Sequence, residues 1–155
     1  MKLTALTVTL SLVAGQVSAL SCMRPDPQAS FQRAADSTDV YYVLYGTLDF
    51  DASLLPGSAG DSNRKPAVPI PAQFEGHSLS DAGFANYYAG EMTLLPTCAG
   101  PWCGSHVPDV ASLMFARVVD GAITIEAAPC GGFIFTEPKQ EVLDSMTACM
   151  NGNCG

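Results

Sequence analysis

The stretch VASLMFARVVDGAITIEAAP, residues 110–129, is the clearest structural motif in this chain. Two apolar runs lie on either side of Asp120-Gly121, and both runs are rich in β-branched residues. A type I′ hairpin turn needs positive φ at both of its central residues, and Asp-Gly is one of the dipeptides that meet this requirement. The stretch therefore predicts an antiparallel β-hairpin.

Further strands are predicted on the N-terminal side of this hairpin. DVYYVLYGTLDF (39–50) is dense in β-branched and aromatic residues, and its Gly46 indicates a bulge or a bend, as in a strand that curls round a small barrel. The segments 69–79 and 82–96 alternate moderately between polar and apolar residues and are expected to pair. A short strand is expected over 133–135.

Two helices are expected, one near each end of the folded region. Asp26 is suited to cap a helix that begins at Pro27 and ends near Ala35. Thr136 is suited to cap a second helix starting at Glu137-Pro138. The apolar stripe of that second helix is formed by Val142, Leu143 and Met146. The predicted fold is mainly β: a small five- to six-stranded OB-fold-like barrel with a short N-terminal helix and a C-terminal helix.

Residues 1–19 have the features of a secretory signal peptide. Lys2 precedes an apolar run that is too short to span a bilayer, and Val17-Ser18-Ala19 places small residues where signal peptidase accepts them. No second apolar stretch approaches spanning length, so we expect a periplasmic or extracellular protein without membrane insertion. Residues 20–155 then form one domain.

Charge narrows the range of partners. Without Lys2, six basic residues stand against fifteen acidic ones, a formal charge of −9. Such a surface repels phosphate backbones, which argues against nucleic acid as a partner.

The six cysteines all follow the predicted signal: Cys22, Cys98, Cys103, Cys130, Cys149 and Cys154. An even number in an oxidising compartment predicts three disulfides, although six cysteines allow fifteen pairings and sequence alone does not choose among them. Cys98–Cys103 and Cys149–Cys154 share one spacing with turn-forming residues between, so each pair suits a small local loop, which would leave Cys22 for Cys130. Cleavage after Ala19 makes Cys22 internal; a lipidated or N-terminal Cys22 is the alternative.

Taken in order, these segments resemble the netrin/TIMP-like OB-fold domain, the module of the tissue inhibitors of metalloproteinases. The resemblance is carried by Cys22-Met-Arg-Pro-Asp-Pro with its helix, by the strand 39–50, and by 98–130 with its cysteines and hairpin. It implies an OB-fold in which a Cys22–Cys130 bond ties the N-terminal segment to the barrel. The inhibitors of this family chelate a protease zinc through the first cysteine of a Cys-x-Cys pair, and Leu20 stands at that position here. The resemblance therefore implies the fold and not the inhibitory contact.

Candidate sites are few. Pro101, Trp102 and His106 are candidate partner contacts, in loops 51–68 and 98–109 that we expect at one rim of the barrel. The C-x₄-C spacing differs from the C-x-x-C of redox sites and favours a structural link. His77 and His106, the two histidines, are weak candidates for a metal site, and solvated loop histidines are the default expectation.

The remaining polar features predict no chemistry. Asp49 and Asp51 flank Phe50 and are expected to be solvated carboxylates at a strand end. The chain lacks G-x-S-x-G, H-E-x-x-H and a phosphate-binding glycine loop, so no catalytic residue and no cofactor are predicted. The expected function is that of an exported, monomeric, non-enzymatic binding module for a protein or glycan partner. The alternatives are a secreted protease inhibitor and a metal-handling protein.

Overall fold

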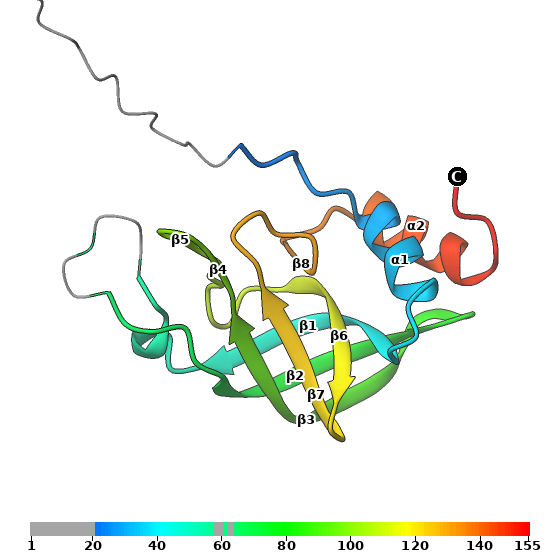
Figure 1. Ribbon diagram of the computed structural model, residues 1–155. Helices are drawn as coiled ribbons and strands as arrows, with labels where there is room; N and C mark the ends of the chain where they lie inside the picture. The colour runs from blue at the N-terminus through cyan, green and yellow to red at the C-terminus, as the bar shows by residue number, and fades with distance from the viewer. Residues whose placement is uncertain (1–20, 58–60, 62–63) are drawn as a thin grey trace, which may run out of the picture.

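The structure is a computed structural model that describes residues 21–57, 61 and 64–155 (Figure 1). The predicted signal peptide, residues 1–19, lies outside the described residues. In chain order the elements are α1 (Pro27–Ala35), β1 (Tyr41–Phe50), the 3-10 turn η1 (Ala52–Leu54), β2 (Ile70–Ser80), β3 (Gly83–Pro96), β4 (Cys98–Ala99), β5 (Trp102–Cys103), β6 (Ser112–Val119), β7 (Ala122–Ala127), β8 (Ile134–Thr136) and α2 (Gln140–Met150).

Five of these strands close into a barrel. Neighbouring strands follow the order β1-β2-β3-β7-β6, and β6 pairs back with β1 to close the ring. The β3–β7 pair is parallel, whereas the other pairs are antiparallel. β8 is an extra strand on β6. This arrangement confirms the expected mainly β fold and is consistent with an OB-like barrel.

The barrel closes through β1, which belongs to two strand pairs. Residues 41–46 of β1 pair with β6, and residues 44–50 pair with β2. Gly46 lies opposite Gly76, and a Cβ on Gly46 would come within 2.2 Å of the Glu75 carbonyl oxygen. Glycine is therefore required for the close approach of the two strands. The prediction for Gly46 was a bulge or a bend. The β1–β2 register runs unbroken through this residue, which rules out the bulge and leaves the bend.

The hairpin predicted around Asp120-Gly121 is confirmed as β6–β7. Val119 pairs with Ala122, and the two turn residues have φ of 48° and 82°. Positive φ at both positions is the geometry of a type I′ turn.

The N-terminal helix is confirmed and the start of the C-terminal helix is corrected. α1 runs over Pro27–Ala35, and the Asp26 carboxylate accepts a hydrogen bond of 2.9 Å from the Gln28 N–H. α2 begins at Gln140, three residues later than expected from the sequence. Thr136 does not cap α2, because it is still paired with Ser112 in β8.

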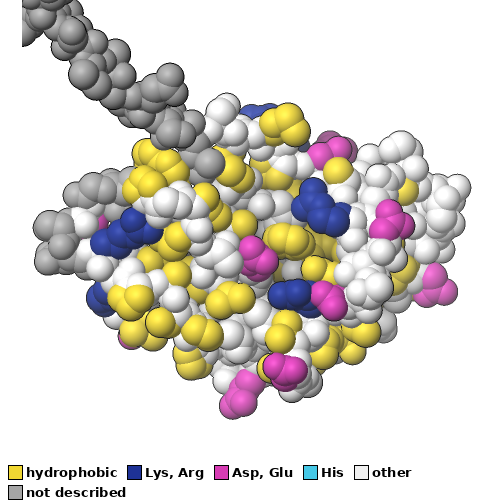
Figure 2. Space-filling view, in the orientation of Figure 1, with side chains coloured by type: hydrophobic (Ala, Val, Ile, Leu, Met, Phe, Trp, Pro, Cys, Tyr) yellow, Lys and Arg dark blue, Asp and Glu magenta, His cyan; other side chains and the backbone are white. Residues whose placement is uncertain are grey.

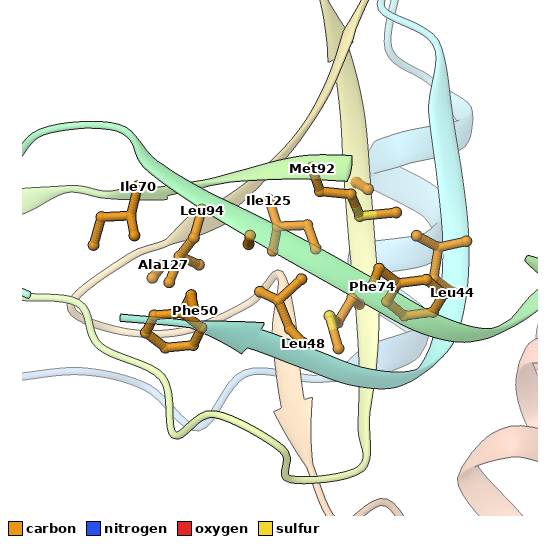
Figure 3. Packing of buried hydrophobic residues seen from close by; sticks show 12 residues of the cluster. Leu44, Leu48, Phe50, Ile70, Phe74, Met92, Leu94, Ile125 and Ala127 are labelled. Carbon is orange, nitrogen blue, oxygen red and sulfur yellow. The ribbon is translucent and has the colours of Figure 1, made fainter. Parts of the chain in front are cut away.

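The core has two parts. Twelve buried side chains fill the barrel, and Figure 3 shows Phe50, Phe74 and Leu48 among those that point into its interior. A second cluster lies between the barrel and the two helices, and includes Phe115, Leu143 and Met146. Burying one such side chain stabilises the fold by about 1.5–3 kcal/mol.

Three disulfides link the chain. Cys22 is bonded to Cys130, Cys98 to Cys103, and Cys149 to Cys154. All three pairs are those that the spacing favoured, and the Cys22–Cys130 bond is also the one that the resemblance implied. No helix within the described ranges is long and apolar enough to cross a membrane.

Candidate functional site

A hollow of about 890 Å³ opens on the side of the barrel. The end of β1, the facing stretches of β2 and β3, and the tip of the β6–β7 hairpin surround it. Its lining residues are Asp49, Phe50, Asp51, Pro71, Ala72, Gln73, Tyr88, Glu91, Met92, Thr93, Gly121, Ala122 and Ile123.

The hollow exists because β3 and β7 separate. They pair only between 93–96 of β3 and 124–127 of β7. On the N-terminal side of Thr93 the two strands have no pairing, so the barrel wall is open there. Met92 is buried and Ile123 half-buried, and both belong to or pack against the barrel core. Apolar side chains of the core therefore form part of the floor of the hollow.

An aromatic side chain extends this floor. Tyr88 is half-buried and its ring stacks on Phe74, with centroids 6.0 Å apart and an interplanar angle of 27°. The stacking fixes Tyr88 against the barrel core at the edge of the hollow.

Carboxylates surround the floor. Asp49, Gln73 and Glu91 are exposed neighbours across three strands, since Gln73 pairs with both of the others. Asp51 accepts a hydrogen bond of 2.9 Å from the Ser53 N–H. Hydrogen bonding from Ser53 lowers the pKa of Asp51, so this carboxylate is ionised at neutral pH.

The side chains that line the hollow carry charge of one sign. Its lining contains three acidic residues and no Lys or Arg, and the whole stretch 66–116 contains neither. Figure 2 shows carboxylates without a basic side chain at the lower end of the molecule, where the β6–β7 hairpin ends in Figure 1. Besides the hydrogen bonding, Lys65 is near enough to lower the pKa of Asp51 as well, so the uncompensated negative charge lies chiefly at Asp49 and Glu91, where it favours cationic groups.

The loops predicted to share a rim are in contact. β4 and β5 form a minimal hairpin closed by the Cys98–Cys103 bond. Arg64 donates a hydrogen bond of 3.0 Å to the Gly100 carbonyl, which joins loop 51–68 to loop 98–109. Trp102 is 39% exposed and Pro101 is exposed as well, and their role as partner contacts stays a prediction.

His106 differs most from its expectation. Only 5% of it is exposed, its ring stacks on Phe50 at 6.1 Å, and its Nε2 atom is buried without a hydrogen-bond partner. Burial lowers the pKa of His106, which favours the neutral ring. The expectation of a solvated loop histidine is therefore wrong for this residue.

The two histidines line separate cavities. His77 lies half-buried on β2 with its ring edge-on to Tyr87 at 5.9 Å, and it lines a cavity beside α2. His106 lines a smaller cavity of about 220 Å³ next to Glu126. Across the described ranges, no three His, Cys, Asp or Glu side chains are grouped so that they could hold a metal ion.

The sequence did not predict the strand residues of the hollow. Tyr88, Met92 and Ile123 were treated as ordinary strand positions, and Asp49 and Asp51 as solvated carboxylates. One signal was present in the sequence: no basic residue occurs over 66–116. The difference in length between β3, with 14 residues, and β7, with 6, is a feature of the structure.

Comparisons with known proteins supply no relative from which a function can be transferred. No protein-family model, no curated protein and no solved structure matches this chain.

Proposed function

We propose that this chain is an exported, non-enzymatic binding domain whose ligand occupies the hollow beside β3. The observation that carries the proposal is an apolar floor surrounded by carboxylates, without a basic residue in the lining. Ligand sites are typically concave and apolar, with a few polar groups that fix orientation. OB-type barrels use this same region, the face of their second and third strands with the adjoining loops, to hold extended ligands.

The charge selects the ligand class. Asp49, Asp51 and Glu91 attract a ligand that carries positive charge and repel one that carries phosphate or carboxylate. A protein segment with Lys or Arg satisfies these carboxylates and also offers apolar groups for the floor at Met92 and Ile123. We therefore favour a cationic protein partner over a neutral glycan.

Two features support assignment to the netrin/TIMP-like class of OB-folds. The barrel has the strand order expected of an OB-like fold, and Cys22 is bonded to Cys130 as the resemblance implied. Protease inhibition and metal handling stay predictions, since neither gains a specific observation from the described residues.

The test is a titration of isotope-labelled protein with an oligolysine peptide, followed by amide chemical shifts. We expect shifts at 88–93 and 121–123. Asp49→Asn/Glu91→Gln is expected to weaken binding about tenfold, because each lost carboxylate removes a direct charge contact. Asp36→Asn/Glu141→Gln is the matched control, because it makes the same charge change at exposed positions on the helices.

Three outcomes would contradict the proposal. Equal weakening by both double variants would show attraction to overall charge and no defined site. Absence of shifts at the hollow would remove the site. Shifts at the same amides with a neutral glucose tetrasaccharide, and none with oligolysine, would replace the protein partner with a glycan.

A further inference from the structure

We propose that the free edge of β3 takes up an additional β-strand from the partner, in the form of an extended segment with basic residues at alternate positions. This inference rests on the proposed function, because it specifies how the partner occupies the hollow. In this recognition mode, an extended peptide is added to the edge of a sheet and is held by backbone hydrogen bonds.

The edge is long and unpaired. β3 pairs with β2 along 83–94 and with β7 only along 93–96, so one side of residues 84–92 has no strand beside it. In an antiparallel ladder, alternate residues direct their N–H and C=O groups away from the partner strand. Among the described residues, no backbone hydrogen bond from a loop reaches 84–92. Figure 1 shows the β2–β3 hairpin extending past the barrel to the right.

Other edges of the barrel are shorter or covered. β8 has three residues. The last residues of β1, beyond its pairing with β6, are covered by the loop that follows β5: the Asp109 N–H donates to the Leu48 carbonyl at 3.1 Å, and His106 stacks on Phe50. No loop backbone hydrogen bond of this kind reaches 84–92 in the described ranges, although Phe84 packs against the second core cluster beside α2.

The sequence of the β3 edge also lacks the usual protection against added strands. Proteins commonly guard such edges with lysine, proline or inward-pointing charges. Residues 84–92 are FANYYAGEM, with Glu91 as the one charged side chain and no proline. An edge left open in this way is suited to pairing with another chain.

The hollow provides the space for an added strand. It lies where β3 and the β6–β7 hairpin separate, and it is bounded by 88, 91–93 and 121–123. The side chains of a strand alternate between two faces, so every second residue of the added strand would face Tyr88, Met92 and Ile123. Apolar residues are preferred at those positions.

The opposite face of the added strand would meet acidic and aromatic groups. Glu91 is exposed on β3, and Glu75, opposite Ala89, lies on the neighbouring strand. Tyr87 is 64% exposed and its hydroxyl lies 3.3 Å from the Glu75 carboxylate. Lysine or arginine on this face can pair with the carboxylates and lie over the Tyr87 ring. The occupant is therefore an alternating basic and apolar segment.

A second copy of this chain is a poorer occupant. Pairing of two β3 edges would bring two copies of Glu91 and Glu75 to one interface, between chains whose region after the predicted signal carries a formal charge of −9. Like charges across a strand pair are destabilising.

The probe is a blocked heptapeptide of alternating lysine and valine, with a glutamate–valine peptide as its control. Two analogues carry N-methyl groups either on the lysines or on the valines, so that each removes the N–H groups along one edge of the peptide strand. Strand addition uses one edge of the peptide, so one analogue should bind about tenfold or more weakly and the other like the parent. Hydrogen exchange should show new protection at alternate amides of 84–92 when the parent peptide binds.

The outcomes separate this inference from the proposed function. If both analogues bind like the parent and exchange at 84–92 is unchanged, strand addition is overturned while cation binding at the hollow stands. If the parent peptide itself does not bind and oligolysine produces no shift at the hollow, both proposals fall. Dimerisation that protects 84–92, measured by sedimentation, would also overturn the inference, because the occupant would then be a second copy.

Discussion

Two edges of the same barrel differ in whether another segment of the chain pairs with them. At the end of β1, the loop after β5 donates a backbone hydrogen bond to Leu48 and places His106 on Phe50. Along 84–92 of β3, no described loop donates such a backbone hydrogen bond, and only Phe84 at its start packs against the cluster beside α2. The covered edge is held by contacts within the chain, whereas the open edge retains unpaired backbone groups. This difference indicates where a partner can still add hydrogen bonds.

A covalent link and a basic residue lie beside the covered edge. The Cys98–Cys103 bond closes the hairpin next to the covering loop, and Arg64 lies against it. The stretch 66–116 contains no Lys or Arg, and it includes β2, β3 and the covering loop itself. The two edges therefore differ in backbone pairing and covalent linkage more than in charge.

The largest loss of stability is expected when the long disulfide is removed. Cys22→Ser/Cys130→Ser removes a bond that closes a sequence separation of 108 residues, and should lower the free energy of unfolding by about 4–5 kcal/mol because the unfolded chain regains its freedom. Cys98→Ser/Cys103→Ser, with a separation of 5, should cost about 2 kcal/mol on the same reasoning. Urea unfolding of both variants provides the measurement. A larger loss in the short-loop variant would mean that the covering loop depends on its local bond more than the barrel depends on the long one.

A smaller loss of stability than this is expected when a glycine at the barrel closure is replaced, and a glycine on the open edge provides the comparison. Gly46→Ala should lower the free energy of unfolding by about 1–3 kcal/mol, because its Cβ would meet backbone atoms of β2 at 2.2 Å. Gly90→Ala is the matched control. Its Cβ would meet the Tyr88 hydroxyl at 2.8 Å, and that group is the far end of a side chain that can move. Equal losses in urea unfolding would show that the open edge is packed as tightly as the closure.

Local sequence signals predicted most of the fold. The Asp120-Gly121 turn, the N-cap at Asp26 and the pairing of 69–79 with 82–96 were readable, because each depends on residues that are near in sequence. Gly46 was read correctly as special, but its role as a close contact with β2 depends on a strand some thirty residues away. The start of α2 was misplaced because pairing of Thr136 with β6 overrides its capping preference.

The candidate site was harder to predict, because it lies where two strands, β3 and β7, do not pair. The hollow depends on the point at which β3 leaves β7, which only the three-dimensional register shows. His106 was misjudged for a related reason: a loop histidine is usually solvated, and its burial here follows from packing on Phe50. The sequence shows carboxylates at a strand end, but it does not show that they surround an opening in the barrel.

Replacing His106 is expected to change the free energy of unfolding least at neutral pH. The change should grow as the solution is made more acidic. Burial lowers the pKa of His106 in the folded state below the ordinary 6.5 of an exposed histidine. As pH falls below this value the unfolded chain takes up the proton first, so the free energy of unfolding decreases. His106→Phe preserves an aromatic ring against Phe50 and removes the titration, so its stability should fall less steeply with pH. Denaturant unfolding at a series of pH values measures the difference.

His77→Gln is the control for this series, because it removes the other histidine and leaves the covering loop intact. The carboxylate of Glu126 lines the same small cavity as His106, but it accepts a hydrogen bond of 3.1 Å from Thr97 Oγ1. A carboxylate can accept further hydrogen bonds, but His106 Nε2 has no hydrogen-bond partner in the structure, so no acceptor is in place for a proton added there. Parallel pH profiles for the wild type and His106→Phe would show that the covering loop opens before the histidine is protonated. The covered edge would then be less firmly held than its contacts indicate, and the contrast with β3 would narrow.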